Sequence, residues 1–300
     1  MRFRSILLPL LVIAPAATAA EPVAQETTLT GNPIRQPAWS ASTRSRLEKD
    51  LEIARAVFDV APDREDSYIW LGRRHGYLGQ YREAIRVFTA GLEKFPDSYK
   101  LYRFRGRHRA RSRDFDGAIA DYLAGIEKMA GQPDSFEPDG LPNSRGLTIS
   151  TYRGNLHYYL GQTSFATGNY RRMISELDLS GRSPIALDID DHRVAVAFWK
   201  YLAHMKLGET ARAAAVLRGI PPELDLIEND SYHRAVGVLK GAVSSEEAEQ
   251  GDSLSRFALG MRLQFAGQRR EAVRVLTALV DDSALGYWPA EVELVGALRN

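Results

Sequence analysis

A run of arginines is the part of the sequence with the clearest chemical potential. Between Tyr102 and Phe115, arginine occupies every second position, at Arg103, Arg105, Arg107, Arg109, Arg111 and Arg113. Guanidinium groups stay charged at neutral pH and bind carboxylates and phosphates through paired hydrogen bonds. The run therefore indicates anion binding. Its period of two fits a β-strand, a basic run can also be a nucleic-acid arm, and a helix would divide the arginines into separate sets.

No other group of residues forms a recognisable catalytic or metal-binding pattern. The six histidines are spread along the chain, and none has the H-E-x-x-H spacing. Asp188, Asp190, Asp191 and His192 could be pictured around a metal, but they precede an apolar helical run, where capping aspartates are expected. There is no glycine-rich phosphate loop, no G-x-S-x-G motif and no cysteine. We therefore expect no metal, no cofactor and no enzymatic activity.

Similar residues recur at a spacing of 34 positions, and this repeat indicates which elements carry the arginines. The matched pairs are Tyr68 and Tyr102, Gly72 and Gly106, Tyr81 and Phe115, Ala84 and Ala118, Ile85 and Ile119, Phe88 and Tyr122, and Gly91 and Gly125. Small residues such as Gly72 and Ala84 suit positions where two helices approach closely, and Pro96 suits the end of the second helix.

The order Leu71-Gly72, then Ala84-x3-Phe88, then Pro96 resembles a tetratricopeptide repeat, or TPR. The resemblance implies an all-α fold, a right-handed superhelical solenoid of antiparallel helix pairs. It covers residues 46–300, with the clearest repeats at 65–98 and 99–132 and degenerate repeats over 152–300. It says little about function, because TPR arrays are scaffolds with many uses.

An insertion interrupts the period at residues 131–151, which contain three prolines and three glycines. We expect this loop either to form part of the binding face or to be a passive surface loop.

The repeat predicts that the arginine run is the first helix of its copy. On a helix, Arg103, Arg107 and Arg111 share one face. First helices of TPR arrays line the concave surface, so the resemblance places this face in a groove. Some TPR domains hold a peptide's C-terminal carboxylate there, although with Lys and Asn where this chain has arginine. The implied partner-binding residues are Arg73, Tyr77, Arg103, Arg107, Arg111, Tyr158 and Gln162.

The second set of arginines is unusual, because Arg105 replaces Leu71 and Arg109 replaces His75 of the first copy. A charge at such a packing position must be paired or reach water. Either these two arginines form a buried network with acids, or the helix is rotated. We also expect the acidic insertion, through Glu137 and Asp139, to fold over the groove and pair with arginines.

The N-terminus indicates export. Arg2 and Arg4 precede an apolar stretch and then small residues up to Ala20, as in a cleavable signal peptide. We expect a signal peptide at residues 1–20, a flexible linker at 21–45, and no membrane span after cleavage. Without cysteine, no bacterial lipid anchor is expected. The predicted location is the periplasm, and secretion fits the signal equally well.

The net charge is only +1, although residues 65–113 hold twelve Lys and Arg against five Asp and Glu. This balance argues against nucleic acid as a partner and favours a local anionic contact. The predicted function is a protein- or peptide-binding adaptor or scaffold of the bacterial envelope, whose arginine-rich groove holds an acidic or C-terminal carboxylate ligand. The alternatives are an enzyme or binding protein for an anionic small molecule or glycan, and a structural oligomer with a self-filled groove.

Overall fold

The computed structural model describes residues 27–299, so the predicted signal peptide at 1–20 lies outside the described residues. Within 27–299 the chain is helical, and its only β-type pairs are two isolated bridges, Thr27 with Pro33 and Phe136 with Thr151. No helix in this range is long and apolar enough to cross a membrane. The prediction of an all-α solenoid is confirmed.

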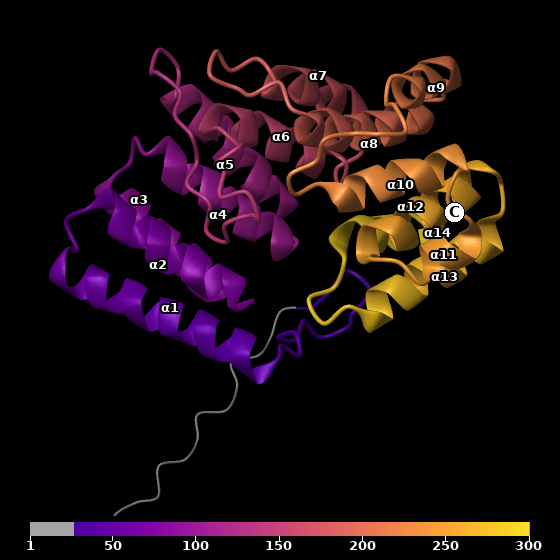
Figure 1. Ribbon diagram of the computed structural model, residues 1–300. Coiled ribbons are helices and arrows are strands. Elements are labelled where there is room, and N and C mark those ends of the chain that lie inside the picture. The colour runs from indigo at the N-terminus through magenta and orange to yellow at the C-terminus, as the bar shows by residue number, and fades with distance from the viewer. Residues whose placement is uncertain (1–26, 300) are drawn as a thin grey trace, which may run out of the picture.

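Fourteen helices follow one another along the described chain (Figure 1). They are α1 (Ala41–Val60), α2 (Glu65–Tyr77), α3 (Tyr81–Lys94), α4 (Tyr99–Arg111), α5 (Phe115–Lys128), α6 (Tyr152–Ser164), α7 (Tyr170–Ser180), α8 (Asp190–Lys206), α9 (Thr210–Arg218), α10 (Asp230–Lys240), α11 (Ser245–Glu249), α12 (Ser253–Phe265), α13 (Arg269–Asp282) and α14 (Trp288–Arg299).

Helix pairs form the repeats, with α2 against α3, α4 against α5, α6 against α7, α8 against α9, and α12 against α13. The arginine run is helical, as the repeat predicts. Glycine allows each pair to pack closely. A methyl group on Gly72 would overlap the ring of Phe88, and one on Gly106 would lie 2.8 Å from the ring of Tyr122.

Gly72→Ala is therefore expected to destabilise the fold by about 1–3 kcal/mol, the usual cost of overpacking a core. Urea unfolding measures the change. Gly296→Ala is the matched control, because a methyl group there meets nothing within 4 Å and alanine suits a helix better than glycine. Equal stability of the two variants would contradict this account of the repeat.

The predicted linker, residues 21–45, is described from residue 27 onward, and this part includes the start of α1 and contacts with the end of the chain. Helix α1 already begins at Ala41, with the Ser40 side chain as its cap. Ile34 is buried, and the N–H of Arg35 donates to the carbonyl of Ala284 at 2.6 Å. Prolines and threonines predict irregular backbone here, but they do not reveal that the segment packs against residues far along the chain.

The array curls until its last helices meet its beginning. Figure 1 shows the yellow C-terminal helices beside the indigo segment that precedes α1. Arg113, in the turn between α4 and α5, forms a buried ion pair with Glu291 of α14, with 2.9 Å between Nε and Oε2. Phe115 packs on Trp288 with ring centroids 5.4 Å apart. These two contacts join the second repeat to the last helix, α14, so the curved array closes on itself.

Candidate functional site

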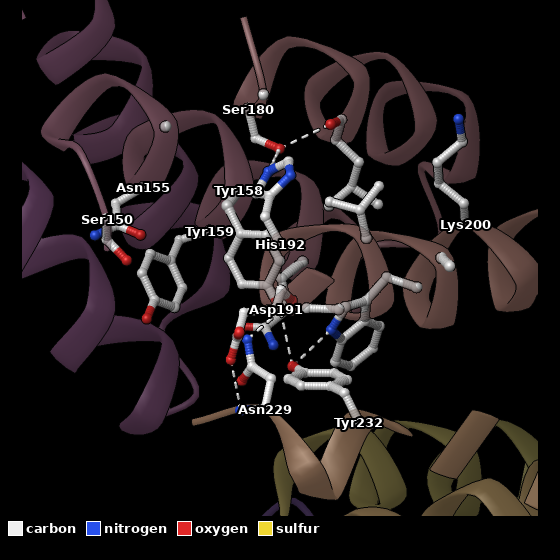
Figure 2. Close-up of a pocket in the computed structure, with 18 of the residues that line it drawn as sticks. Ser150, Asn155, Tyr158, Tyr159, Ser180, Asp191, His192, Lys200, Asn229 and Tyr232 are labelled. Carbon is white, nitrogen blue, oxygen red and sulfur yellow. Dashed lines mark hydrogen bonds between the residues drawn. The ribbon is translucent and has the colours of Figure 1, made fainter. Parts of the chain in front are cut away.

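A cavity of about 1030 Å³ lies on the concave side, between α4 and α6 and the helices α8 and α10. Arg107 and Arg111 line it from α4. Figure 2 shows the facing side, where Tyr232 of α10 reaches toward Tyr158 of α6. Their hydroxyl oxygens are 2.8 Å apart, and the indole N–H of Trp199 donates to Tyr232 at 3.0 Å.

The structure divides the predicted partner-binding residues into two groups. Four of them line the cavity: Arg107, Arg111, Tyr158 and Gln162. The other three, Arg73, Tyr77 and Arg103, do not line it, because the non-helical segment between α5 and α6 covers them. We call this segment, residues 129–151, the strap. It contains the predicted insertion at 131–151.

The strap places a carboxylate against the first arginine of the concave face. Glu137 Oε2 lies 2.7 Å from Arg103 Nε, and the Arg103 side chain is only 1% exposed. The side-chain amide of Asn155 donates to the same oxygen at 3.0 Å. Two backbone hydrogen bonds hold the strap at this point, from Glu137 N to Ser150 O and from Tyr152 N to Ser135 O.

The strap also covers the groove in front of α2. Arg74 donates to the carbonyl oxygen of Gly140 at 3.0 Å, and a side chain at Gly140 would overlap the Tyr77 hydroxyl. Arg73 lies buried and donates to that hydroxyl at 3.1 Å. Asp139 forms no ion pair within 4.0 Å among the described residues, and burial raises its pKa although Arg73 opposes the shift. The predicted pairing with the strap therefore involves Glu137 and not Asp139.

The second set of arginines forms a buried network, which was the first of the two alternatives. Arg105 donates to both oxygens of Asp121 on α5, at 2.9 and 2.7 Å. Arg109 lies 3.1 Å from the same carboxylate and 3.5 Å from Asp114. A single buried acid on the second helix thus replaces the apolar contact that Leu71 provides in the first copy.

Arg107 and Arg111 differ from the other four arginines of the run. Within residues 27–299 neither has a carboxylate oxygen within 4.0 Å. Arg107 lies over the ring of Tyr159 at 5.2 Å, and Arg111 lies over the ring of Tyr81 at 5.5 Å. Burial alone would raise the pKa of Tyr159, but the charges of Arg107 and Arg103 outweigh it and the pKa is lowered. The α4 wall of the cavity is therefore strongly positive.

The aspartates at the start of α8 have a structural role. Asp191 is buried and accepts hydrogen bonds from the backbone N–H groups of Ile227, Glu228 and Asn229, at 2.8–2.9 Å. His192 contacts the Ser180 hydroxyl at 2.9 Å (Figure 2). This arrangement fixes the segment before α10. No cluster among the described residues has the composition of a metal site.

Several aromatic residues of the cavity were not among the predicted partner-binding residues, including Tyr122, Tyr159 and Tyr232. Tyr122 aligns with Phe88 in the repeat, so the hydroxyl group that Tyr122 adds was the sequence feature that could have indicated a polar role. Tyr159 follows the predicted Tyr158 directly. Tyr232 belongs to a degenerate repeat, where no motif indicates which side faces inward.

Buried His108 should make the stability of this region depend on pH. Burial lowers its pKa well below the usual value, and Arg111 lowers it further. The folded state therefore keeps the ring neutral, while the unfolded chain binds a proton near pH 6.5. Stability is fully present above that pH and is lost as the pH falls below it.

Between pH 7.5 and 5.5, His108 alone should account for a loss of about 1.4 kcal/mol, the value of one pKa unit. Urea unfolding of the native chain and of His108→Phe at both pH values measures this contribution. The variant should lose less stability on acidification than the native chain. An identical loss in both would show that His108 is not the group responsible.

Known proteins show the same fold. Residues 71–134 match the family model for the tetratricopeptide repeat. A TPR protein structure from Parabacteroides merdae is similar over 86% of this chain and 94% of its own, with a TM-score of 0.51 and 13% identity. YrrB, described as a TPR protein with an unusual peptide-binding site, matches over 83% of this chain and 100% of its own, with a TM-score of 0.43 and 13% identity. No curated protein sequence matches the chain.

Proposed function

Because residues 71–134 match the tetratricopeptide-repeat model and the described chain has the fold of TPR proteins, we propose that the protein is a protein- or peptide-binding adaptor or scaffold of the bacterial envelope. The TPR fold itself suggests interaction with proteins. The finer proposal is that the partner inserts an acidic side chain or its C-terminal carboxylate into the cavity. Arg107 and Arg111 would hold this group, and Tyr158 and Gln162 would flank it.

The observation that carries the proposal is the pair of arginines on the cavity wall that have no acidic partner within residues 27–299. The other arginines of the run are already matched by Glu137, Asp121 and Glu291. A carboxylate from a partner would give Arg107 or Arg111 the same kind of paired hydrogen bonds. The proposed site is therefore smaller than the groove predicted from the sequence, since the strap occupies the part in front of α2.

The envelope location rests on the sequence of the first twenty residues, which has the order of a signal peptide. Cell fractionation and N-terminal sequencing of the native protein test it. A mature chain that begins near Glu21 in the periplasmic fraction supports the proposal, and an intact N-terminus in the cytoplasm contradicts it. Crosslinking in intact cells would then identify the partner.

Arg107→Ala is expected to weaken binding of an acidic peptide by about tenfold or more, because one charge-assisted hydrogen bond contributes about 1.5–3 kcal/mol. Fluorescence anisotropy with a labelled hexaglutamate peptide, carrying a free C-terminus, measures the dissociation constant. Arg270→Ala is the control, because it removes the same charge from the exposed surface of α13. An unchanged dissociation constant in Arg107→Ala would count against the site.

A further inference from the structure

The charge balance on the inner face of α4 shows what kind of anion the cavity fits. This face carries Arg103, Arg107 and Arg111, one helical turn apart. Glu137 neutralises Arg103 in a buried ion pair. Among the described residues no carboxylate lies within 4.0 Å of the other two. Two adjacent guanidinium groups on this wall thus lack a carboxylate contact. Burial followed by the charge of Arg107 lowers the pKa of Arg111, whereas for Arg107 the effect of burial is outweighed by Tyr159, Tyr77 and the more distant Glu137, and its pKa is raised.

The acids elsewhere in the cavity do not compensate these charges. Asp178 pairs with Lys200 at 2.6 Å, and Asp191 is occupied by backbone N–H groups. Burial, followed by the charge of Asp139, raises the pKa of Glu228 and so favours its neutral form. The excess positive charge therefore stays at the α4 wall.

Hydrogen-bond donors gather beside the two arginines. Tyr122 is fully buried, lines the cavity, and has a hydroxyl group without a hydrogen-bond partner among the described residues. Such a group is costly to leave unsatisfied, by about 1–3 kcal/mol. Tyr159 lies between Arg103 and Arg107, whose guanidinium carbons are 4.6 and 5.2 Å from its ring centroid. Its lowered pKa makes its hydroxyl a better donor to an anion.

We infer that the arginine recess, defined as Arg107, Arg111, Tyr122 and Tyr159, binds a tetrahedral dianion of the phosphate type, free or as a monoester. A single carboxylate carries one charge and would leave one arginine uncompensated. A phosphate monoester carries about −1.5 to −2 at pH 7 and offers three acceptor oxygens. It can accept from both guanidinium groups and from the Tyr122 hydroxyl. The inference rests on the site of the proposed function and goes beyond it, because it names a doubly charged tetrahedral anion where the proposed function names a carboxylate.

Isothermal titration calorimetry on the full chain, at constant ionic strength in chloride buffer, provides the test. The probes are inorganic phosphate, methyl phosphate, sulfate, acetate and glutarate. Phosphate and sulfate should bind at least about tenfold more tightly than acetate, since they match two guanidinium groups and not one. Tighter binding of methyl phosphate than of inorganic phosphate indicates an ester as the ligand, and binding of inorganic phosphate alone indicates the free ion.

The pH dependence distinguishes a dianion from a generic anion effect. A phosphate monoester loses its second charge with a pKa near 6, so the affinity for methyl phosphate should fall about tenfold between pH 7.5 and pH 5.0. Sulfate stays doubly charged over this range and should keep its affinity.

Variants locate the site. Arg111→Gln should weaken phosphate binding by about tenfold or more, and Tyr122→Phe by about threefold to tenfold, as expected for a charged and a neutral donor. Arg270→Ala should leave it unchanged. Tyr122→Phe keeps the packed ring, so it remains informative if the arginine variant unfolds.

Acetate or glutarate binding as tightly as phosphate would overturn the inference, and so would phosphate binding that survives both recess variants. The results that refute the dianion differ from the results that refute the proposed function. Hexaglutamate binding that depends on Arg107 without competition by phosphate would refute only the dianion. Phosphate binding without any peptide binding would refute only the peptide adaptor.

Discussion

Glu137→Gln is expected to lower the free energy of unfolding by about 3–5 kcal/mol, the cost of removing one partner of a buried ion pair. The amide has the shape of the carboxylate, so the variant leaves Arg103 charged, 1% exposed and without its counter-charge. Urea unfolding measures the loss. Because the pair is buried, the loss should persist at 1 M salt, where exposed pairs are screened.

Two controls accompany this variant. Asp139→Asn should change stability little, since Asp139 forms no ion pair within 4.0 Å in the described chain. Asp225→Asn removes the exposed partner of Arg145 and should cost less than about 1 kcal/mol. In the double variant Arg103→Met with Glu137→Leu, most of the stability should return, because no buried charge is left unpaired. If Glu137→Gln were as stable as the native chain, the strap would not be anchored by this pair.

Arg113→Gly is expected to cost about 1–4 kcal/mol, as the balance of two opposed effects. Arg113 has a φ of 64°, whereas the corresponding turns of other repeats have glycine at Gly79, Gly168, Gly208 and Gly267. Glycine removes a backbone penalty of about 1–2 kcal/mol. The same change leaves Glu291, which is fully buried, without its cation, at a cost of about 3–5 kcal/mol. The ion pair therefore outweighs the unfavourable backbone.

Hydrogen exchange should locate this effect. Protection should fall in residues 27–35 and 285–297, because Glu291 also accepts from the N–H of Leu29 and Arg113 donates to the carbonyl of Leu285. Protection in α2 and α3 should stay unchanged. Adding Glu291→Gln to Arg113→Gly should restore part of the stability. A more stable Arg113→Gly variant would mean that the contact between the second repeat and α14 contributes little.

The architecture could be predicted from the sequence because it depends on local signals repeated along the chain. Gly72 and Gly106 lie at close helix contacts and are 34 residues apart, and Pro62 and Pro96, just after two helix ends, have the same spacing. Helix formation and pairing with the next helix need only these neighbours. The same period identified the arginine run as a helix and separated its six arginines into two sets on different faces.

The partner of each arginine could be predicted only in part. Arg105 and Arg109 were expected to need acids, and Asp121 lies in the next helix of the same repeat. Glu137, the partner of Arg103, lies in the insertion that interrupts the 34-residue period, and it was expected to pair with arginines. Both contacts join segments that are adjacent in the chain, so repeat spacing brings them close.

By itself, the sequence determined the repeat, the helical state of the arginine run and the presence of an acidic loop next to it. Only the tertiary structure decided that Arg113 binds Glu291, 178 residues away, and that residues 27–35 pack on the C-terminal helices. It also decided that, within the described chain, Arg107 and Arg111 line the cavity with no carboxylate oxygen within 4.0 Å. The curvature of a solenoid is the sum of small rotations between successive repeats. No single repeat therefore encodes where the two ends of the array meet.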